Sequence, residues 1–404
     1  MPDLLIRPSG LDAALMDTFL MPLAGRPPGD VVVRPRLVLP AHIAASKTQF
    51  ADSARRAGVP VLVDLDTYFL QDLQHPGDPW AKLPFARPDV LTPTQLTREL
   101  ALDITRAAIA AQIAAGATAL MCPYIHIKAA GDGWAERQIL LYRAMRAVLD
   151  AEKISLPTVA VVDIGWRLLE RPAWSQALGP LLAAIDAAGF DEIALSATGV
   201  DDGAKPQDRT ASLLAAIARA KVTAPVIAFN QGLLGELAIA GGAVGYSTGI
   251  GWRERPDTPT RMRERRAAPE PNSPRSRRPV FIGKLGRSIA ANTVAELISH
   301  RTIAPDLPCP PGRGCCRDGA SALTGDGRWH ALYARVSLPC DLANTDHRFR
   351  WAELARRAQE GIDLAARINV VAEREHLNRV NDAALRAIAI CATAQQSRIA
   401  RRAA

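Results

Sequence analysis

The sequence predicts an α/β fold, a (β/α)₈ TIM barrel that carries a cysteine-rich insertion and C-terminal helices. Short β-branched runs alternate with longer Ala- and Leu-rich segments of helical period through the first three hundred residues. Eight such βα units in roughly 270 residues fit a barrel whose chemistry takes place at the carboxyl ends of its strands. A doubly wound open sheet is the alternative, but no glycine fingerprint opens the first helix.

The individual elements follow from where the apolar pattern changes its period. The predicted strands cover residues 31–39, 59–63, 117–121, 158–162, 192–196, 225–229, 242–247 and 279–283. The predicted helices cover residues 44–57, 94–114, 135–151, 174–188, 210–220, 233–240, 349–372 and 382–402.

The composition is that of a globular protein with an uneven charge. The 404 residues include 48% hydrophobic ones and carry a formal net charge of +8, which excludes a wholly disordered or fibrous chain. Residues 1–252 hold 22 basic and 25 acidic side chains, whereas residues 253–404 hold 27 and 16. This asymmetry indicates a polyanionic partner, nucleic acid or an anionic membrane surface. The alternative is a general preference for Arg, since 42 of the 49 basic residues are Arg.

The N-terminus lacks the charged-then-apolar pattern of a signal peptide, and the apolar stretches are too short and interrupted to cross a bilayer. We therefore expect a cytoplasmic protein without a membrane partner. In such a reducing compartment, clustered cysteines indicate metal ligation rather than disulfides.

A basic segment, residues 253–278, separates the last two predicted strands. It contains nine Arg and five Pro and few apolar residues. We expect a mobile loop on the catalytic face that grips phosphates, and a solvated linker is the alternative. The preceding Gly249 and Gly251 could cradle a phosphate with Arg253, or they could simply let the loop turn.

The cysteine-rich insertion predicts a structural zinc site. Cys309, Cys315 and Cys316 fall within eight residues, and His330, Cys340 and His347 follow. Zinc prefers four thiolate or imidazole ligands, and a thiolate-rich closed site leaves no position for a catalytic water. Unliganded core cysteines are the alternative. We accordingly divide the chain into a barrel, residues 1–305, and a zinc-binding segment with C-terminal helices, residues 306–404.

Four segments, VPVLVDLDTYFLQ, TVAVVDIG, GFDEIALSATGV and AGGAVGYSTGIGWRER, together with the cysteine-rich insertion, resemble in their order the tRNA-guanine transglycosylase family. The resemblance implies a zinc-containing barrel that exchanges or modifies a nucleobase. It places Asp64 at the first catalytic Asp of the family, Asp163 and Ser196 at base-reading positions, and Ser247 at the position of the nucleophile.

The same resemblance implies a set of metal ligands, and it also shows where this sequence departs from the pattern of the family. It favours His347, which starts a helix, over the nearer His330 as the fourth ligand beside Cys309, Cys315 and Cys316. It also matches Arg253 to an Arg of the family. However, Ser247 replaces a carboxylate that should attack the ribose, which puts the ordinary reaction in doubt.

Further candidates follow from the ends of the predicted strands. Asp64 and Asp66, two residues apart, could face one cavity and split their pKa values. One of them could instead cap the next segment or pair with Arg. The remaining candidates are a strand-end acid, Asp163, the rim residues Tyr124 and His126, the amides of Asn230 and Gln231, and the phosphate candidates Lys284 and Arg287.

Three functional hypotheses stay open at this point. The first is a divergent transglycosylase-like protein in which Asp64, Asp66, Asp163 and Ser247 are the catalytic candidates. The second is a catalytically inactive binding subunit of such an enzyme, working in a homodimer or with a heteromeric partner. The third is a TIM-barrel enzyme that acts on a phosphorylated small molecule.

Overall fold

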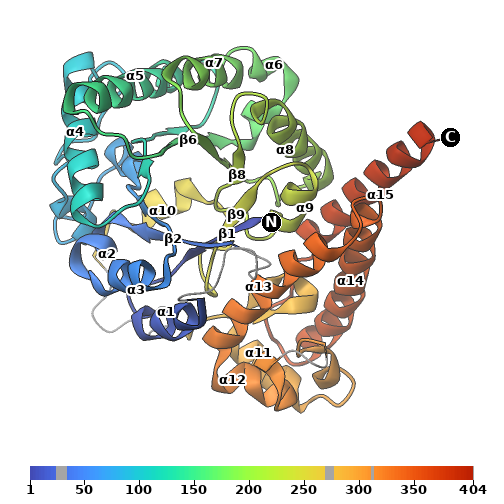
Figure 1. Cartoon of the computed structure of the whole chain (residues 1–404). Coiled ribbons are helices and arrows are strands. Elements are labelled where there is room, and N and C mark those ends of the chain that lie inside the picture. Colours follow the sequence, from blue (N-terminus) through green and yellow to red (C-terminus); the bar gives the residue numbers. More distant parts are fainter. Residues whose placement is uncertain (24–33, 269–276, 311–313, 404) are drawn as a thin grey trace.

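The computed structural model describes residues 1–23, 34–268, 277–310 and 314–403, and it confirms the (β/α)₈ barrel (Figure 1). All pairings in the barrel sheet are parallel, and the strands follow the order β3-β2-β1-β9-β8-β7-β6-β4, with β5 beside β6. Their bounds are β1 (Asp3–Arg7), β2 (Arg34–Pro40), β3 (Val61–Asp64), β4 (Leu120–Met121), β5 (His126–Ile127), β6 (Thr158–Gly165), β7 (Glu192–Thr198), β8 (Val226–Ala228) and β9 (Gly245–Gly249).

The ring is joined between β3 and β4 by a side chain as well as by the backbone. The Thr118 amide donates to the carbonyl oxygen of Val61 at 2.9 Å, and the Val61 amide donates to the Thr118 hydroxyl at 2.9 Å. The short β4 and β5 are two pieces of the fourth barrel strand. The barrel is therefore nearly closed.

Helices surround the strands (Figure 1), and eight helices of the described residues form this outer ring. The eighth position belongs to α13, which lies far along the chain: Ala331, Leu332 and Ala334 are part of the barrel core, and Trp329 meets Phe19 of α1 with ring centroids 6.4 Å apart. The outer helices are α1 (Ala13–Leu20), α3 (Gln49–Ala57), α4 (Arg98–Ala114), α5 (Trp134–Glu152), α7 (Leu178–Ala188), α8 (Pro206–Ala220), α9 (Gly235–Ala240) and α13 (Gly327–Asn344).

Two predictions about the strands were wrong. The sequence analysis missed β1, whose five residues are all buried although Asp3 and Arg7 bound it. It also counted residues 279–283 as the eighth barrel strand. That run forms β10 (Val280–Ile282), which pairs antiparallel with β11 (Arg287–Ile289) in a separate hairpin. The basic segment consequently follows the last barrel strand instead of preceding it.

The chain between β9 and α13 is an insertion, and the chain after α13 forms two long helices. The insertion holds α10 (Thr258–Glu264), the hairpin, α11 (Ala291–Ser299) and α12 (Ala322–Gly325), and the long helices are α14 (Arg350–Arg374) and α15 (Ala383–Ala403). The barrel thus draws on residues on both sides of the predicted division at 305. Short helices α2 (Ala41–Ser46) and α6 (Arg171–Trp174) complete the described part. Within it, no helix has the length and apolar character that crossing a membrane requires.

Candidate active site and metal centre

A buried ion pair lies at the carboxyl ends of β1 and β3. An Nη1 atom of Arg7 contacts Oδ2 of Asp64, and the Tyr124 hydroxyl donates to Oδ1 of Asp64 at 2.7 Å. All three side chains are almost fully buried. Because both oxygens of Asp64 are engaged, this carboxylate is held in place and is not free to attack a substrate.

Asp66 completes this centre with a different environment. It lies two residues beyond β3 in the left-handed backbone region, at φ 48°, and its carboxylate accepts from the Tyr68 hydroxyl at 3.0 Å. Burial alone would raise the pKa of Asp66, but Arg253, Arg7 and further guanidinium groups lower that pKa to about 2. Burial and the charge of Asp66 raise the pKa of Asp64 against the opposing effect of Arg7. The two acids lie at one centre, and their pKa values are drawn apart.

The irregular chain between β4 and β5 is fixed by side chains that replace a backbone ladder. Four side chains each make two hydrogen bonds to the backbone of this segment. Gln112 bonds to the backbone of Met121, and Thr67 bonds to the backbone of Tyr124. Gln138 bonds to the backbone of residues 123 and 125, and Gln71 bonds to the backbone of His126. The His126 amide, for example, donates to Gln71 Oε1 at 2.6 Å. This bracing sets the positions of Tyr124 and His126.

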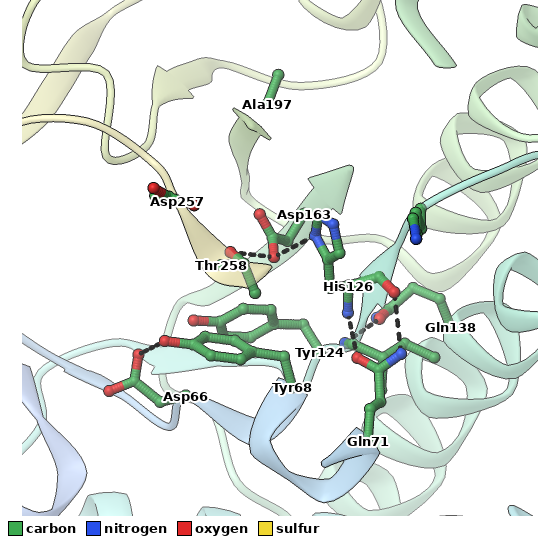
Figure 2. A network of polar contacts seen from close by, with 12 residues as sticks. Asp66, Tyr68, Gln71, Tyr124, His126, Gln138, Asp163, Ala197, Asp257 and Thr258 are labelled. Atoms are coloured by element: carbon green, nitrogen blue, oxygen red, sulfur yellow. Dashed lines mark hydrogen bonds and ion pairs between the residues drawn. The ribbon is translucent and has the colours of Figure 1, made fainter. Parts of the chain in front are cut away.

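His126 and Asp163 form a dyad beside this centre (Figure 2). Nδ1 of His126 lies 3.0 Å from Oδ2 of Asp163, and the Thr258 hydroxyl donates to the same oxygen at 2.9 Å. The other oxygen of Asp163 is buried without a hydrogen-bond partner. No hydrogen bond within the described residues engages Nε2 of His126. A carboxylate thus orients the imidazole and leaves its second nitrogen for proton transfer.

The basic segment that we expected to be a mobile phosphate grip is structured over residues 253–268, and its arginines face the protein's own acids. Arg265 and Arg266 pair with Asp78 and Asp72 at 2.5 and 2.8 Å, and Arg255 lies 3.2 Å from Asp202. Arg278, just past the undescribed residues 269–276, pairs with Asp12 at 2.8 Å. These four charges are paired with acids of the chain itself. Helix α10 lies over the barrel centre (Figure 1).

The glycines before this segment serve a tight turn. The Gly249 amide donates to the Arg253 carbonyl at 3.2 Å, and a Cβ on Gly249 would lie only 1.6 Å from the Trp252 carbonyl oxygen. Gly251 has φ +81°. Of the two functions considered for these glycines, the structure supports the turn. Arg253 itself, at φ 58°, places Nη1 4.0 Å from Asp66 Oδ2.

The other predicted barrel residues are buried on the remaining strands. The Ser247 hydroxyl accepts a hydrogen bond from the backbone amide of Asn230 at 2.6 Å. The side-chain amide of Gln231 donates to the carbonyl oxygen of Ala197 at 3.0 Å. Ser196 pairs in register with Asp163, and its hydroxyl has no hydrogen-bond partner within the described residues. No hydrogen bond among the described residues joins Ser247 to Asp64 or Asp163.

Arg287 lies near Glu254 and Asp201 in the loops that follow β9 and β7, and Lys284 lies in the turn of the hairpin. Lys284 pairs with Asp306 at 2.5 Å, and Arg287 donates to the Asn381 carbonyl oxygen at 2.6 Å. Both belong to the hairpin region rather than to a barrel strand end. The eighth-strand position on which their selection rested was wrong, and a phosphate-binding role for them stays a prediction.

A candidate metal centre lies between the insertion and α13. The ligand atoms of Cys309, Cys315, Cys316 and His330 all lie within 4.8 Å of one another. Nε2 of His330 lies 2.8 Å from the Phe281 carbonyl oxygen, so Nε2 carries the proton and Nδ1, 3.1 Å from the Cys316 sulfur, stays available as a ligand. This donor set can hold a metal ion.

The predicted fourth ligand, His347, was wrong. Its side chain is 81% exposed and lies beside Asp346. Helix α13 begins at Gly327, and its first turn carries His330 to the cysteines. The resemblance placed the helix start at His347, which lies seventeen residues after His330 in the sequence.

Sequence reasoning missed three residues of the centre: Arg7, Thr258 and His42. Arg7 is the last residue of the run DLLIR, just as Asp64 is the last residue of VLVD. This shared position at the end of an apolar run could have identified Arg7 as a site residue. Thr258 follows Asp257, which caps α10 through its side chain. Nothing in the sequence around His42 marks its proximity to the acids.

Comparisons with known proteins add little to this geometry. No protein-family model matches the sequence, and no curated protein matches it. Among solved structures, a protein provisionally assigned as a phosphonomutase from Burkholderia cenocepacia J2315 is 15% identical, with 61% of this chain and 86% of that chain covered at a TM-score of 0.33. Dihydrodipicolinate synthase from Oceanobacillus iheyensis is 10% identical, with coverage of 98% and 96% at a TM-score of 0.32. TM-scores this low carry no weight, and the barrel assignment rests on the strand order.

The metal centre predicts a contrast between two histidines. His330→Ala removes one of four converging ligands, so the purified variant is expected to retain only a small fraction of the metal bound by the unaltered protein. His347→Ala is the matched control, because the exposed imidazole should leave metal content unchanged. Metal analysis after dialysis measures both. Equal metal content in the two variants would contradict this ligand set.

His42 predicts a loss of stability in mild acid. Burial lowers the pKa of His42 to about 4, with Arg265 and Arg253 reinforcing the effect and Asp66 and Asp78 opposing it. Below the ordinary pKa of 6.5 the unfolded state binds the proton more readily, so the free energy of unfolding should fall as the pH drops from 6.5 to about 4. Urea unfolding at several pH values should show a shallower decline for His42→Gln. An identical decline in both proteins would refute the assignment.

Proposed function

We propose that the chain is a (β/α)₈-barrel enzyme that acts on a small molecule by general acid–base catalysis, with His126 and Asp163 as the proton-transferring dyad. The single observation that supports this most is the Asp163 contact with Nδ1 of His126 at the carboxyl end of the barrel, where barrel enzymes carry out their chemistry. When Nδ1 donates to this carboxylate, Nε2 of the neutral ring is the nitrogen that can accept a proton.

In this proposal each polar group has a distinct task. His126 takes a proton from the substrate at Nε2 and returns it later, while Asp163 stabilises the transient imidazolium. Tyr124 remains a phenol, because burial and the nearby charges of Asp64 and Asp66 raise its pKa. Asp64 is neutralised by Arg7 and thus holds Tyr124 in position.

We further propose that the Cys309, Cys315, Cys316 and His330 cluster binds Zn²⁺ in a structural role. Three thiolates and one imidazole form a closed tetrahedral set, which leaves no position for a reactive water. The ion would fix the start of α13 against β10 and takes no part in the proposed proton transfer.

The dyad is tested by activity profiling with matched variants. The protein is incubated with a cell extract of small metabolites, and mass spectrometry follows which compounds disappear with time. His126→Asn is expected to slow that turnover about 10²- to 10⁴-fold. The exposed His347→Asn serves as control and should keep the full rate. Turnover that survives in His126→Asn would overturn the proposal.

A transglycosylase-like function on nucleic acid is the second candidate, either active or as a binding subunit. The cysteine and histidine cluster between the eighth strand and α13, together with acids that end β3 and lie in β6, favours it. The engaged hydroxyl of Ser247 and the ion-paired Asp64 oppose it, because neither is a free nucleophile.

A titration against tRNA and duplex DNA separates the two candidates. A protein that neutralises many phosphates would lose about 10³-fold or more in affinity between roughly 50 and 200 mM salt. We expect no such salt-dependent binding, because the arginines around α10 are paired with the chain's own acids. Tight binding with a steep salt response would instead establish the second candidate.

A further inference from the structure

A small pocket opens beside the acidic centre at the carboxyl ends of β1, β2 and β9. Its volume is about 90 Å³, which is enough for about three waters or one small oxyanion. Of its lining residues, only Arg7 has a task in the proposed proton transfer, where it pairs with Asp64. They are Arg7, Pro8, Ser9, Pro40, Ile43, Ile250, Trp252 and Arg253.

Two guanidinium groups in this lining have donors to spare. Arg7 is 2% exposed, and its Nε and Nη2 atoms are buried without a hydrogen-bond partner. Nη1 of Arg253 is likewise buried without one. A buried donor without a partner is destabilising, most of all when it is charged, so an acceptor bound at this site would be favourable.

The surrounding charges do not balance. Three arginines, the buried Arg7 and the half-buried Arg253 and Arg261, act on the two carboxylates of Asp64 and Asp66. Burial lowers the pKa of Arg253, Asp66 opposes this, and the positive charges of Arg261 and Arg7 lower it further. The other nearby arginine, Arg265, is matched by Asp78. One positive charge therefore remains uncompensated, and an anion would compensate it.

The backbone of Arg253 is held in an unfavourable conformation, and this conformation sets the position of its guanidinium group at the pocket. A left-handed φ of 58° is costly for a long side chain, and such strain persists where the surrounding structure enforces it, often at functional sites. The tight turn to Gly249 enforces it here. The neighbouring Trp252 is 39% exposed and packs on Arg278, with the guanidinium carbon 4.6 Å from the ring centroid. It forms a flat apolar wall at the pocket.

We propose that this pocket binds the oxyanionic group of the substrate, a phosphate or a carboxylate, through Arg7 and Arg253, with Trp252 covering the adjoining apolar part. The inference rests on the proposed function and names its substrate class as a small organic anion. Guanidinium groups suit such ligands because their planar forks match carboxylate and phosphate oxygens.

The experiment measures binding of inorganic phosphate, and separately of acetate, to the whole protein by calorimetry. Phosphate or acetate should bind the unaltered protein, and Arg253→Asn should weaken that binding about tenfold or more, since it removes charge-assisted bonds. Asn tolerates a left-handed backbone, so this variant should keep its melting temperature. Arg263→Asn is the matched control, because Arg263 is exposed on α10 and bonds only within its own helix.

The binding measurements distinguish between the two substrate classes and can also overturn the proposed pocket. Stronger binding of phosphate assigns a phosphorylated substrate, and comparable binding of acetate assigns a carboxylate; both support the pocket. Binding of neither ion, or equal weakening in Arg253→Asn and Arg263→Asn, overturns the pocket. If Arg253→Asn melts early, Arg253→Lys replaces it and should still weaken phosphate severalfold, because it keeps the charge and loses the fork. His126→Asn should bind phosphate normally, so failure of the dyad and failure of the pocket are distinguishable.

Discussion

The buried contact between Arg7 and Asp64 is the interaction on which the rest of the centre depends. It joins the ends of β1 and β3, and it costs on the order of several kcal/mol per ion to bury such charges. The structure meets this cost with the Tyr124 hydroxyl on Asp64 and with the nearby carboxylate of Asp66. Apolar side chains would stabilise the same position more simply. A retained ion pair with spare donors is therefore better explained by ligand binding than by stability.

The acids of the barrel also determine which arginines of the chain remain available to bind an external anion. The excess of arginine after residue 252 suggested an external polyanion. In the structure, α10 and its flanks bring Arg255, Arg265 and Arg266 onto acids of the barrel loops. The charge thereby holds a segment over the barrel mouth, and Thr258 from that segment reaches Asp163 (Figure 2). What stays uncompensated is a single buried charge near Arg253, which suits a small anion better than a nucleic acid.

The sequence predicted the barrel well because buried parallel strands are continuous apolar runs, as TVAVVDIG shows. It missed β1 because the charged Asp3 and Arg7 bound a run of only three apolar residues. It misplaced β10 because an apolar run looks the same in a barrel and in a hairpin. Asp64, Asp66 and Asp163 were found as strand-end acids. Tyr124, His126 and Arg253 were also named, but their pairing with these acids was not, since contacts such as that of Thr258 with Asp163 span 95 positions.

The insertion and the site are linked through the residue next to Arg253. Glu254 accepts from the Ser288 amide at 2.8 Å and from Arg335 at 2.7 Å, so its position depends on the hairpin and on α13. The metal centre in turn ties α13 to the hairpin, because His330 donates to the Phe281 carbonyl. Ordering the start of α13 therefore orders Glu254, and with it the strained turn that presents Arg253. A metal bound at the cysteines would influence the proposed anion pocket along this route, by fixing its geometry and not by entering its chemistry.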